Sequence, residues 1–235
     1  MRVLVSQLWP DECLFATNFI CRIADMRFTL PGVYPITDAK ISGLSHAEQV
    51  RRLCAGGATL VQLREKRLSP REFYSEAEAA LRVAREYGAK LIINDRADLA
   101  LALGADGLHI GQNDLPPEAA RRLLGEEAII GFSTHSLTQA VAAAQMPLDY
   151  LALGPIFGTS TKETPDPVVG LDGLRRVRKA VGDTLPLVAI GGITPANARA
   201  VWQAGADSIA VISCLLADAQ TISQQLHDMF ALSRN

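Results

Sequence analysis

Basic and acidic side chains stand together in this sequence directly after a short apolar segment. Arg64 and Lys66 flank Glu65, and all three follow residues 59–63. Arginine offers a planar pair of donors to phosphate oxygens, and lysine offers a point charge. The cluster therefore indicates either an anion-binding site or a solvated group of charges with a local ion pair to Glu65. These residues alone do not decide between the two.

Two aspartates follow the next two apolar segments. Asp95 comes after residues 90–93, and Asp114 comes after residues 107–110. Carboxylates at neighbouring strand ends could share one hard cation, because Mg²⁺ prefers a few carboxylates together with substrate phosphates and water. The alternative is that each aspartate caps the helix that follows it. The basic residues nearby favour a metal–diphosphate site.

A second group of candidate phosphate ligands lies in the C-terminal half. Gly191 and Gly192 follow the apolar segment 185–190, and Ser213 follows the last such segment. Glycine lets backbone N–H groups approach an anion closely, although a Gly-Gly pair also fits a plain tight turn. The segment 159–162 adds hydroxyls and a lysine within a long loop, which is typical either of a lid or of a mobile polar loop.

The four histidines fall in three different sequence contexts. His135 follows an apolar segment and is either an acid–base group or a structural imidazole bonded to the backbone. His109 lies within an apolar segment and is expected to pack inside the protein. His46 and His227 are expected on the surfaces of helices.

Short segments rich in Val, Ile and Leu must position these residues. Each is a near-continuous apolar run, which predicts a parallel strand buried on both faces. The eight predicted strands are residues 32–36, 59–63, 90–93, 107–110, 128–132, 150–153, 185–190 and 208–212. Amphipathic stretches that alternate with them predict helices at residues 45–54, 70–87, 117–124, 137–145, 171–181, 195–204 and 221–230.

Eight such units in about 200 residues favour a closed barrel over an open sheet. The predicted fold class is α/β, a single (β/α)₈ TIM barrel over residues 31–235, with a short N-terminal extension at 1–30. Active sites of such barrels lie at the C-terminal ends of the strands, where the polar candidates above stand. The extension is interpreted as disordered, or as preceding a native start at Met26.

Composition narrows the classes of partner. The chain has 235 residues, of which 49% are hydrophobic and 20% charged, as in a globular protein. A net charge of −2 gives no electrostatic reason to expect nucleic acid or an anionic membrane. No apolar run reaches the roughly 18 residues of a membrane span. We therefore expect a cytoplasmic protein with small-molecule partners, and a homo-oligomer is compatible with this fold.

Short motifs along the chain, taken together, resemble the thiamine phosphate synthase family. They are residues 34–38, 62–66, 93–96, 109–116, 131–136, 154–157, 159–162, 189–193 and 211–213. Each motif alone is weak, but nine in family order are specific. The resemblance covers the chain from about residue 32 to residue 232.

The resemblance implies a transferase of thiamine biosynthesis that joins a pyrimidine diphosphate to a thiazole phosphate and releases diphosphate through a pyrimidine-methyl cation. It implies that the pyrimidine diphosphate is held by Gln62, Leu63, Arg64, Glu65, Lys66, Asn94, Ser133 and Lys162, with Arg64, Lys66, Ser133 and Lys162 as the catalytic residues. It implies that the thiazole phosphate is held by Thr159, Ser160, Thr161, Gly192, Ile212 and Ser213. It also implies a Mg²⁺ cofactor on Asp95 and Asp114.

Three other functions are compatible with parts of the sequence. A related thiazole tautomerase shares the barrel and uses a histidine near the position of His135 as its base, and a non-catalytic barrel could bind thiazole phosphate as a regulator. Neither needs the diphosphate and metal groups, so their joint presence argues against both. A phosphate-binding isomerase barrel fits the fold alone, but not the second- and third-strand motifs. One departure from the family is Phe157-Gly158, where the family often has proline, which implies a more flexible loop.

Overall fold

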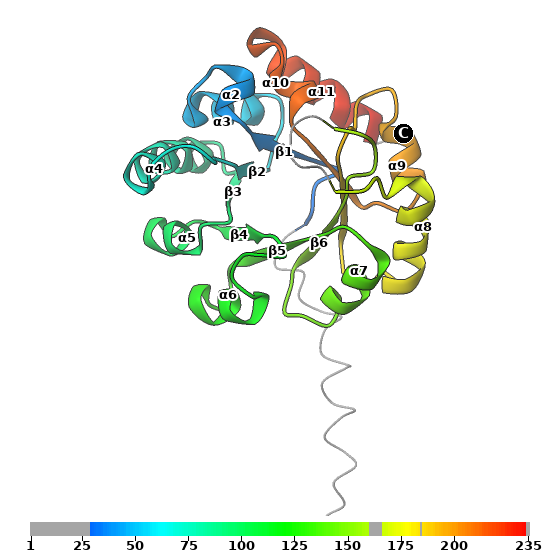
Figure 1. The fold of residues 1–235 in the computed structure, drawn as a ribbon. Helices are drawn as coiled ribbons and strands as arrows, with labels where there is room; N and C mark the ends of the chain where they lie inside the picture. Colours follow the sequence, from blue (N-terminus) through cyan, green and yellow to red (C-terminus); the bar gives the residue numbers. More distant parts are fainter. Residues whose placement is uncertain (1–28, 160–165, 184, 234–235) are drawn as a thin grey trace, which may run out of the picture.

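The computed structural model describes residues 29–159, 166–183 and 185–233. Within them, eight parallel strands close into a barrel in sequence order, with helices around the outside (Figure 1). The strands are β1 (Val33–Thr37), β2 (Leu60–Leu63), β3 (Lys90–Asn94), β4 (Gly107–Ile110), β5 (Ile129–Thr134), β6 (Tyr150–Leu153), β7 (Leu187–Ile190) and β8 (Ser208–Val211). The predicted barrel is confirmed, whereas the predicted extension lies almost entirely outside the described residues.

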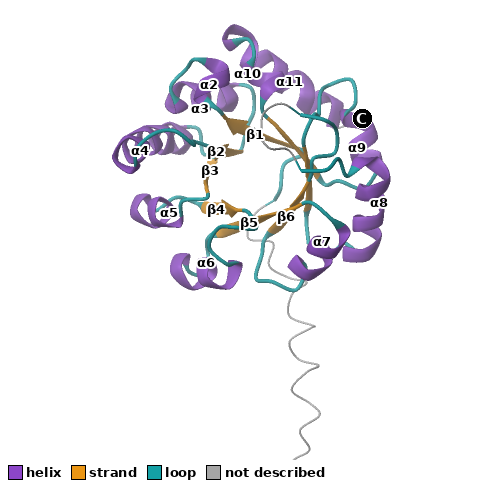
Figure 2. Cartoon of the chain, viewed as in Figure 1, coloured by secondary structure: helices purple, strands orange, loops and turns teal. Residues whose placement is uncertain are grey.

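The helices lie around the outside of the strands (Figure 2). They are α2 (Ala39–Ser42), α3 (His46–Ala55), α4 (Pro70–Glu86), α5 (Ala97–Leu103), α6 (Pro117–Leu124), α7 (Leu137–Ala143), α8 (Gly170–Val181), α9 (Ala198–Gln203), α10 (Ser213–Leu216) and α11 (Ile222–Ser233), with a 3₁₀ turn at Ala219–Thr221. Three of them were not predicted: α2 and α10 are single turns, and α5 has no clear polar face. No helix among the described residues is long and apolar enough to cross a membrane.

The strands are largely apolar because they are covered on both faces. Along β2, Val61 and Leu63 pack against the helices, whereas Leu60 and Gln62 face the barrel interior. This alternation places a second, smaller apolar cluster inside the barrel. The polar residues that follow β2, β3, β4, β5 and β8 thereby reach the same rim.

At the opposite rim, formed by the N-terminal ends of the strands, aspartates hydrogen-bond neighbouring strands to one another. The aspartates that directly precede β4, β6 and β8 each accept a backbone N–H near the start of the preceding strand; the pairs are Asp106 with Leu91, Asp149 with Ile130 and Asp207 with Leu187. Arg121 strengthens one of these joints. Its guanidinium lies 2.6 Å from Asp149 Oδ2 and 2.6 Å from the carbonyl oxygen of Ala128. This end of the barrel serves stability.

Arg121→Ala is expected to lower the free energy of unfolding by about 3 kcal/mol, because it leaves the Asp149 carboxylate and a backbone carbonyl without their buried donor. Urea unfolding measures the change. Arg122→Ala is the matched control, since its side chain is exposed and its removal is expected to change stability by less than about 0.5 kcal/mol. Equal losses in the two variants would contradict this account of the rim.

Candidate active site

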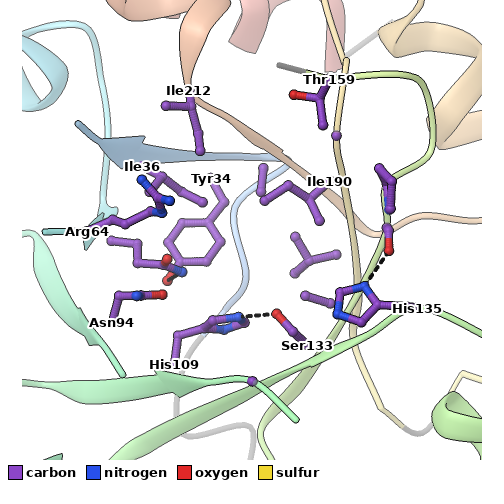
Figure 3. A pocket seen from close by; sticks show the side chains of 18 of the residues that line it. Tyr34, Ile36, Arg64, Asn94, His109, Ser133, His135, Thr159, Ile190 and Ile212 are labelled. Atoms are coloured by element: carbon purple, nitrogen blue, oxygen red, sulfur yellow. Dashed lines mark hydrogen bonds between the residues drawn. The ribbon is translucent and has the colours of Figure 1, made fainter. Parts of the chain in front are cut away.

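A cavity of about 610 Å³ opens at the C-terminal ends of the strands. Figure 3 shows Arg64 and Asn94 on one side of it, Thr159 and His135 on the other, and Tyr34 between them. The predicted site residues that line the cavity are Gln62, Arg64, Lys66, Asn94, Asp95, Asp114, Ser133, Thr159, Gly192, Ile212 and Ser213. Ser160, Thr161 and Lys162 lie outside the described residues.

The side chains of Leu63 and Glu65 do not line this cavity. Leu63 is fully buried in the apolar layer between strands and helices. Glu65 turns away and meets His46, whose Nε2 lies 3.1 Å from Glu65 Oε2. Burial alone would raise the pKa of Glu65, but hydrogen bonds from His46 and from the backbone hold that pKa below its usual value. The prediction that His46 lies on a helix surface is wrong, because His46 is 1% exposed.

Each basic residue of the strand-two motif is held by a carboxylate across the cavity rim. Arg64 Nη1 lies 2.8 Å from Asp38 Oδ2, at the end of β1. The Nζ of Lys66 pairs with Asp95, at the end of β3. Neither cation pairs with Glu65, so the local ion pair considered from the sequence is absent from the described contacts. The cations instead face the cavity, where an anion could reach both.

Asp95 and Asp114 lie close together and do not cap helices. The first residues of α5 and α6 receive no side-chain cap, which excludes the capping alternative for both. Asp114 Oδ2 instead accepts the backbone N–H of Gly111 at 2.7 Å. Partial burial, and then the neighbouring carboxylate of Asp95, raise the pKa of Asp114. Two carboxylates that repel each other at a cavity rim gain from a shared cation.

Among the described residues, no group of three or more His, Cys, Asp or Glu side chains could enclose a metal ion. The pair Asp95 and Asp114 therefore offers an incomplete coordination shell. This fits Mg²⁺, which keeps several waters and binds through one or two carboxylates plus substrate phosphates. It does not fit a structural metal that the protein must enclose by itself.

A chain of buried hydrogen bonds forms the floor of the cavity. Tyr34 joins Gln62 on one side, at 3.3 Å, and Tyr150 on the other, with 3.1 Å between the two hydroxyl oxygens. His109 continues the chain, with Nδ1 2.9 Å from the hydroxyl of Tyr150 and Nε2 2.8 Å from Ser133 Oγ. His109 is buried as predicted, and its ring also lines the floor of the cavity.

The two tyrosines were missed as site residues because an inward strand position is ordinarily part of the core. The available signal was a polar tip on an aromatic ring at such a position, since a buried tyrosine hydroxyl needs a partner. Gly131, on the neighbouring strand, makes room for the ring. A Cβ at Gly131 would lie 2.0 Å from Tyr150 Cζ, so the floor depends on glycine there.

His109 is neutral at physiological pH, because burial lowers its pKa from 6.5 to about 4. Between these two pH values the unfolded chain binds a proton that the folded chain does not. The resulting stability is present above about pH 6.5 and falls by about 3 kcal/mol as the pH drops to about 4. We expect the stability difference between wild type and His109→Asn to shrink by this amount between pH 7 and pH 4, measured by urea unfolding. A difference that does not change with pH would contradict the lowered pKa.

The other half of the cavity is apolar and ends in a glycine turn. Its lining comes from β6, β7, β8 and the end of β1: Ile36, Ala152, Val188, Ile190, Ala210 and Ile212. Gly191 and Gly192 have φ values of 102° and 64°. A Cβ at Gly192 would lie 2.5 Å from the carbonyl oxygen of Gly158. The tight-turn interpretation therefore holds, and the turn also brings backbone to the cavity beside Ser213.

His135 stands at the edge of this apolar half. Its Nδ1 lies 2.7 Å from the carbonyl oxygen of Gly154 and 3.5 Å from Asp166 Oδ2. The bond to the backbone is the one expected of a structural imidazole, yet the ring also lines the cavity. Its position alone does not assign a catalytic role.

Comparison with known proteins identifies the family. Residues 33–215 match the model of the family described as thiamine monophosphate synthase. The chain belongs to this family. Thiamine-phosphate synthase from Chloroflexus aurantiacus is 44% identical over 218 residues, covering 92% of this chain and 97% of that protein. The same enzyme from Koribacter versatilis is 50% identical over 196 residues, covering 80% and 90%.

A solved structure agrees with these relatives. Thiamine phosphate pyrophosphorylase from Pyrococcus furiosus superposes with a TM-score of 0.78 at 37% identity, over 89% of this chain and 98% of that one. The resemblance inferred from the nine motifs is thus confirmed. As a member of the thiamine monophosphate synthase family, the chain is an enzyme of the transferase class.

Proposed function

We propose that this chain condenses 4-amino-2-methyl-5-(diphosphooxymethyl)pyrimidine with 4-methyl-5-(2-phosphoethyl)thiazole, or with its carboxylated form, to give thiamine phosphate and diphosphate. The observation that carries the proposal is the arrangement of Arg64, Lys66, Asp95 and Asp114 on one side of a cavity whose floor is neutral and hydrogen-bonding. That arrangement suits a diphosphate above a polar heterocycle. The apolar half opposite suits a second ring.

The diphosphate end of the proposed site contains both cations. Arg64 and Lys66 now lie against Asp38 and Asp95, and a diphosphate would offer them a more highly charged partner. Asp95 and Asp114 are the residues that would hold Mg²⁺, which would neutralise charge on the leaving diphosphate when bound. Lys162 is proposed to join them from the long loop.

The pyrimidine is proposed to lie on the hydrogen-bonded floor. An aminopyrimidine presents a donor and ring acceptors, and Gln62 and Asn94 carry amide groups that can both donate and accept. Ser133 adds a hydroxyl that His109 holds in place. Because His109 is uncharged, it places no positive charge beneath a pyrimidine-methyl group that becomes cationic.

The proposed reaction is dissociative. The bond between the pyrimidine methylene carbon and the diphosphate oxygen breaks, and its electron pair leaves with the diphosphate. The lone pair of the thiazole nitrogen then forms the new C–N bond. Arg64 and Lys66 would stabilise the leaving group more in the transition state than in the ground state. The apolar wall around Ile190 would exclude water that could otherwise capture the cation.

The thiazole phosphate is proposed to bind at the glycine turn. Gly192, Ile212 and Ser213 line the cavity there together with Thr159, and Ser160 and Thr161 are proposed to complete the site. The small phosphorylated substrates accord with a cytoplasmic enzyme. No contact among the described residues favours the tautomerase or the regulator over the synthase.

The test is product formation from both phosphorylated substrates together and from each alone. We expect thiamine phosphate only when both are present. Bound thiazole phosphate without product would support the non-catalytic regulator. A changed thiazole isomer in the absence of the pyrimidine substrate would support the tautomerase, and either result would refute the proposal.

A further inference from the structure

His46, the first residue of α3, lies behind the loop that carries both cations of the proposed diphosphate end. Its Nε2 lies 3.1 Å from Glu65 Oε2, and its Nδ1 lies 2.8 Å from Thr37 Oγ1. Both ring nitrogens are thus engaged, one with the loop after β2 and one with the last residue of β1. The buried ring therefore links these two segments from the helix side.

Glu65 ties this loop into a fixed turn. Its Oε2 meets His46, while its Oε1 accepts the backbone N–H groups of Lys66 and Arg67 at 2.7 and 2.6 Å. Only 8% of the side chain is exposed. Because a carboxylate only accepts, Nε2 of His46 must carry the proton between them. With Glu65 directed toward α3 and away from the cavity, the side chains of Arg64 and Lys66 on either side of it reach the cavity.

Helix α3 also braces Arg64. Thr37 Oγ1 accepts the backbone N–H of Arg64 at 3.3 Å as well as meeting His46. Gln49, one turn further along α3 and fully buried, accepts the backbone N–H of Asp38 at 2.9 Å. Asp38 in turn holds the guanidinium of Arg64. The helix therefore positions Arg64 through its backbone and through its side chain.

We propose that His46 is a positioning residue for the diphosphate end of the site. Through Glu65 it fixes the turn that carries Lys66, and through Thr37 it fixes the backbone of Arg64. The inference rests on the proposed function, because it assigns these cations to a diphosphate. A catalytic group displaced by about 1 Å can cost about a hundredfold in rate, and loss of a supporting residue behind a site typically costs about 10- to 100-fold.

The first test is His46→Ala, with two measurements. The KM for the pyrimidine diphosphate is expected to rise about tenfold, while the KM for the thiazole phosphate stays unchanged. The affinity for inorganic pyrophosphate with Mg²⁺, measured by calorimetry, is expected to fall by a similar factor. This second measurement needs no turnover.

Two conservative variants divide the role of the ring between its nitrogens. His46→Gln keeps a donor that can reach Glu65, and His46→Asn keeps a polar group nearer to Thr37. We expect His46→Gln to restore more of the pyrophosphate affinity than His46→Asn, because the Glu65 turn carries Lys66. If His46→Ala does not fold, this comparison decides, and equal affinities in the two variants would overturn the inference.

Arg121→Ala is the control for a purely structural effect. It removes a buried side chain of the opposite rim, so it should lower stability and leave pyrophosphate affinity unchanged. Equal pyrophosphate affinities in His46→Ala and Arg121→Ala would overturn the positioning role. A wild-type chain that binds pyrophosphate but forms no thiamine phosphate would refute the proposed function. The inference about His46 would still be decided by the pyrophosphate affinity of His46→Ala relative to that of Arg121→Ala.

Discussion

Arg64→Ala is expected to lower kcat/KM for the pyrimidine diphosphate at least about tenfold. The guanidinium is the proposed fork for diphosphate oxygens, and its charge acts most strongly when the leaving group takes the electron pair. Its removal also leaves Asp38 without its 2.8 Å partner at the cavity rim, which places an uncompensated negative charge near the substrate. Both effects act in the same direction. Steady-state kinetics with each substrate varied in turn measures the change.

Arg67→Ala is the matched control for Arg64→Ala. Arg67 stands on the same loop, is exposed and does not line the cavity. Only its backbone N–H contributes to the loop turn, through Glu65, and the substitution leaves that group in place. The control is expected to keep near wild-type kinetics. Similar losses in both variants would mean that the net charge of the loop matters and that a specific Arg64 contact does not.

Asp95→Asn is expected to lower turnover at least about tenfold and to raise the Mg²⁺ concentration needed for half-maximal activity. The amide keeps the shape of the side chain but removes the negative charge that pairs with Lys66 and that faces Asp114. Asp114→Asn is expected to behave in the same way. Activity measured over a series of Mg²⁺ concentrations separates a loss of metal affinity from a loss of rate.

Asp98→Asn tests whether any carboxylate in this region would have the same effect. Asp98 pairs with Arg96 at 2.5 Å on the surface of α5, and it does not line the cavity. Its loss should leave the Mg²⁺ dependence unchanged. An unaltered Mg²⁺ requirement in both Asp95→Asn and Asp114→Asn would contradict the metal site.

The sequence was sufficient for the barrel because its strands are buried on both faces. Each one then appears as a near-continuous apolar run, and a parallel barrel carries the residues after all such runs to one rim. That is why Arg64, Asp95 and Ser213, far apart in the chain, line one cavity. Short helices such as α5 were not predicted, because seven residues without a clear polar face show no helical periodicity.

Residues whose roles depend on a partner elsewhere in the chain could not be predicted. Glu65 resembles a substrate contact because it stands between two cations, but its side chain turns away to His46. His46 stands at the start of a predicted helix, and nothing in the sequence indicates that the ring is buried against Glu65 and Thr37. Tyr34 and Tyr150 belong to strands 116 residues apart, and only closure of the barrel brings their hydroxyls together.

The most direct test of the central claim is the release of pyrophosphate from the pyrimidine diphosphate, measured with and without thiazole phosphate and with Mg²⁺ or a chelator. The proposed site predicts one pyrophosphate for each thiamine phosphate formed, and no formation of either product when the chelator is present. Equal product formation with and without the chelator would contradict the metal–diphosphate site. Failure to form thiamine phosphate with both substrates and Mg²⁺ would contradict the proposed function itself.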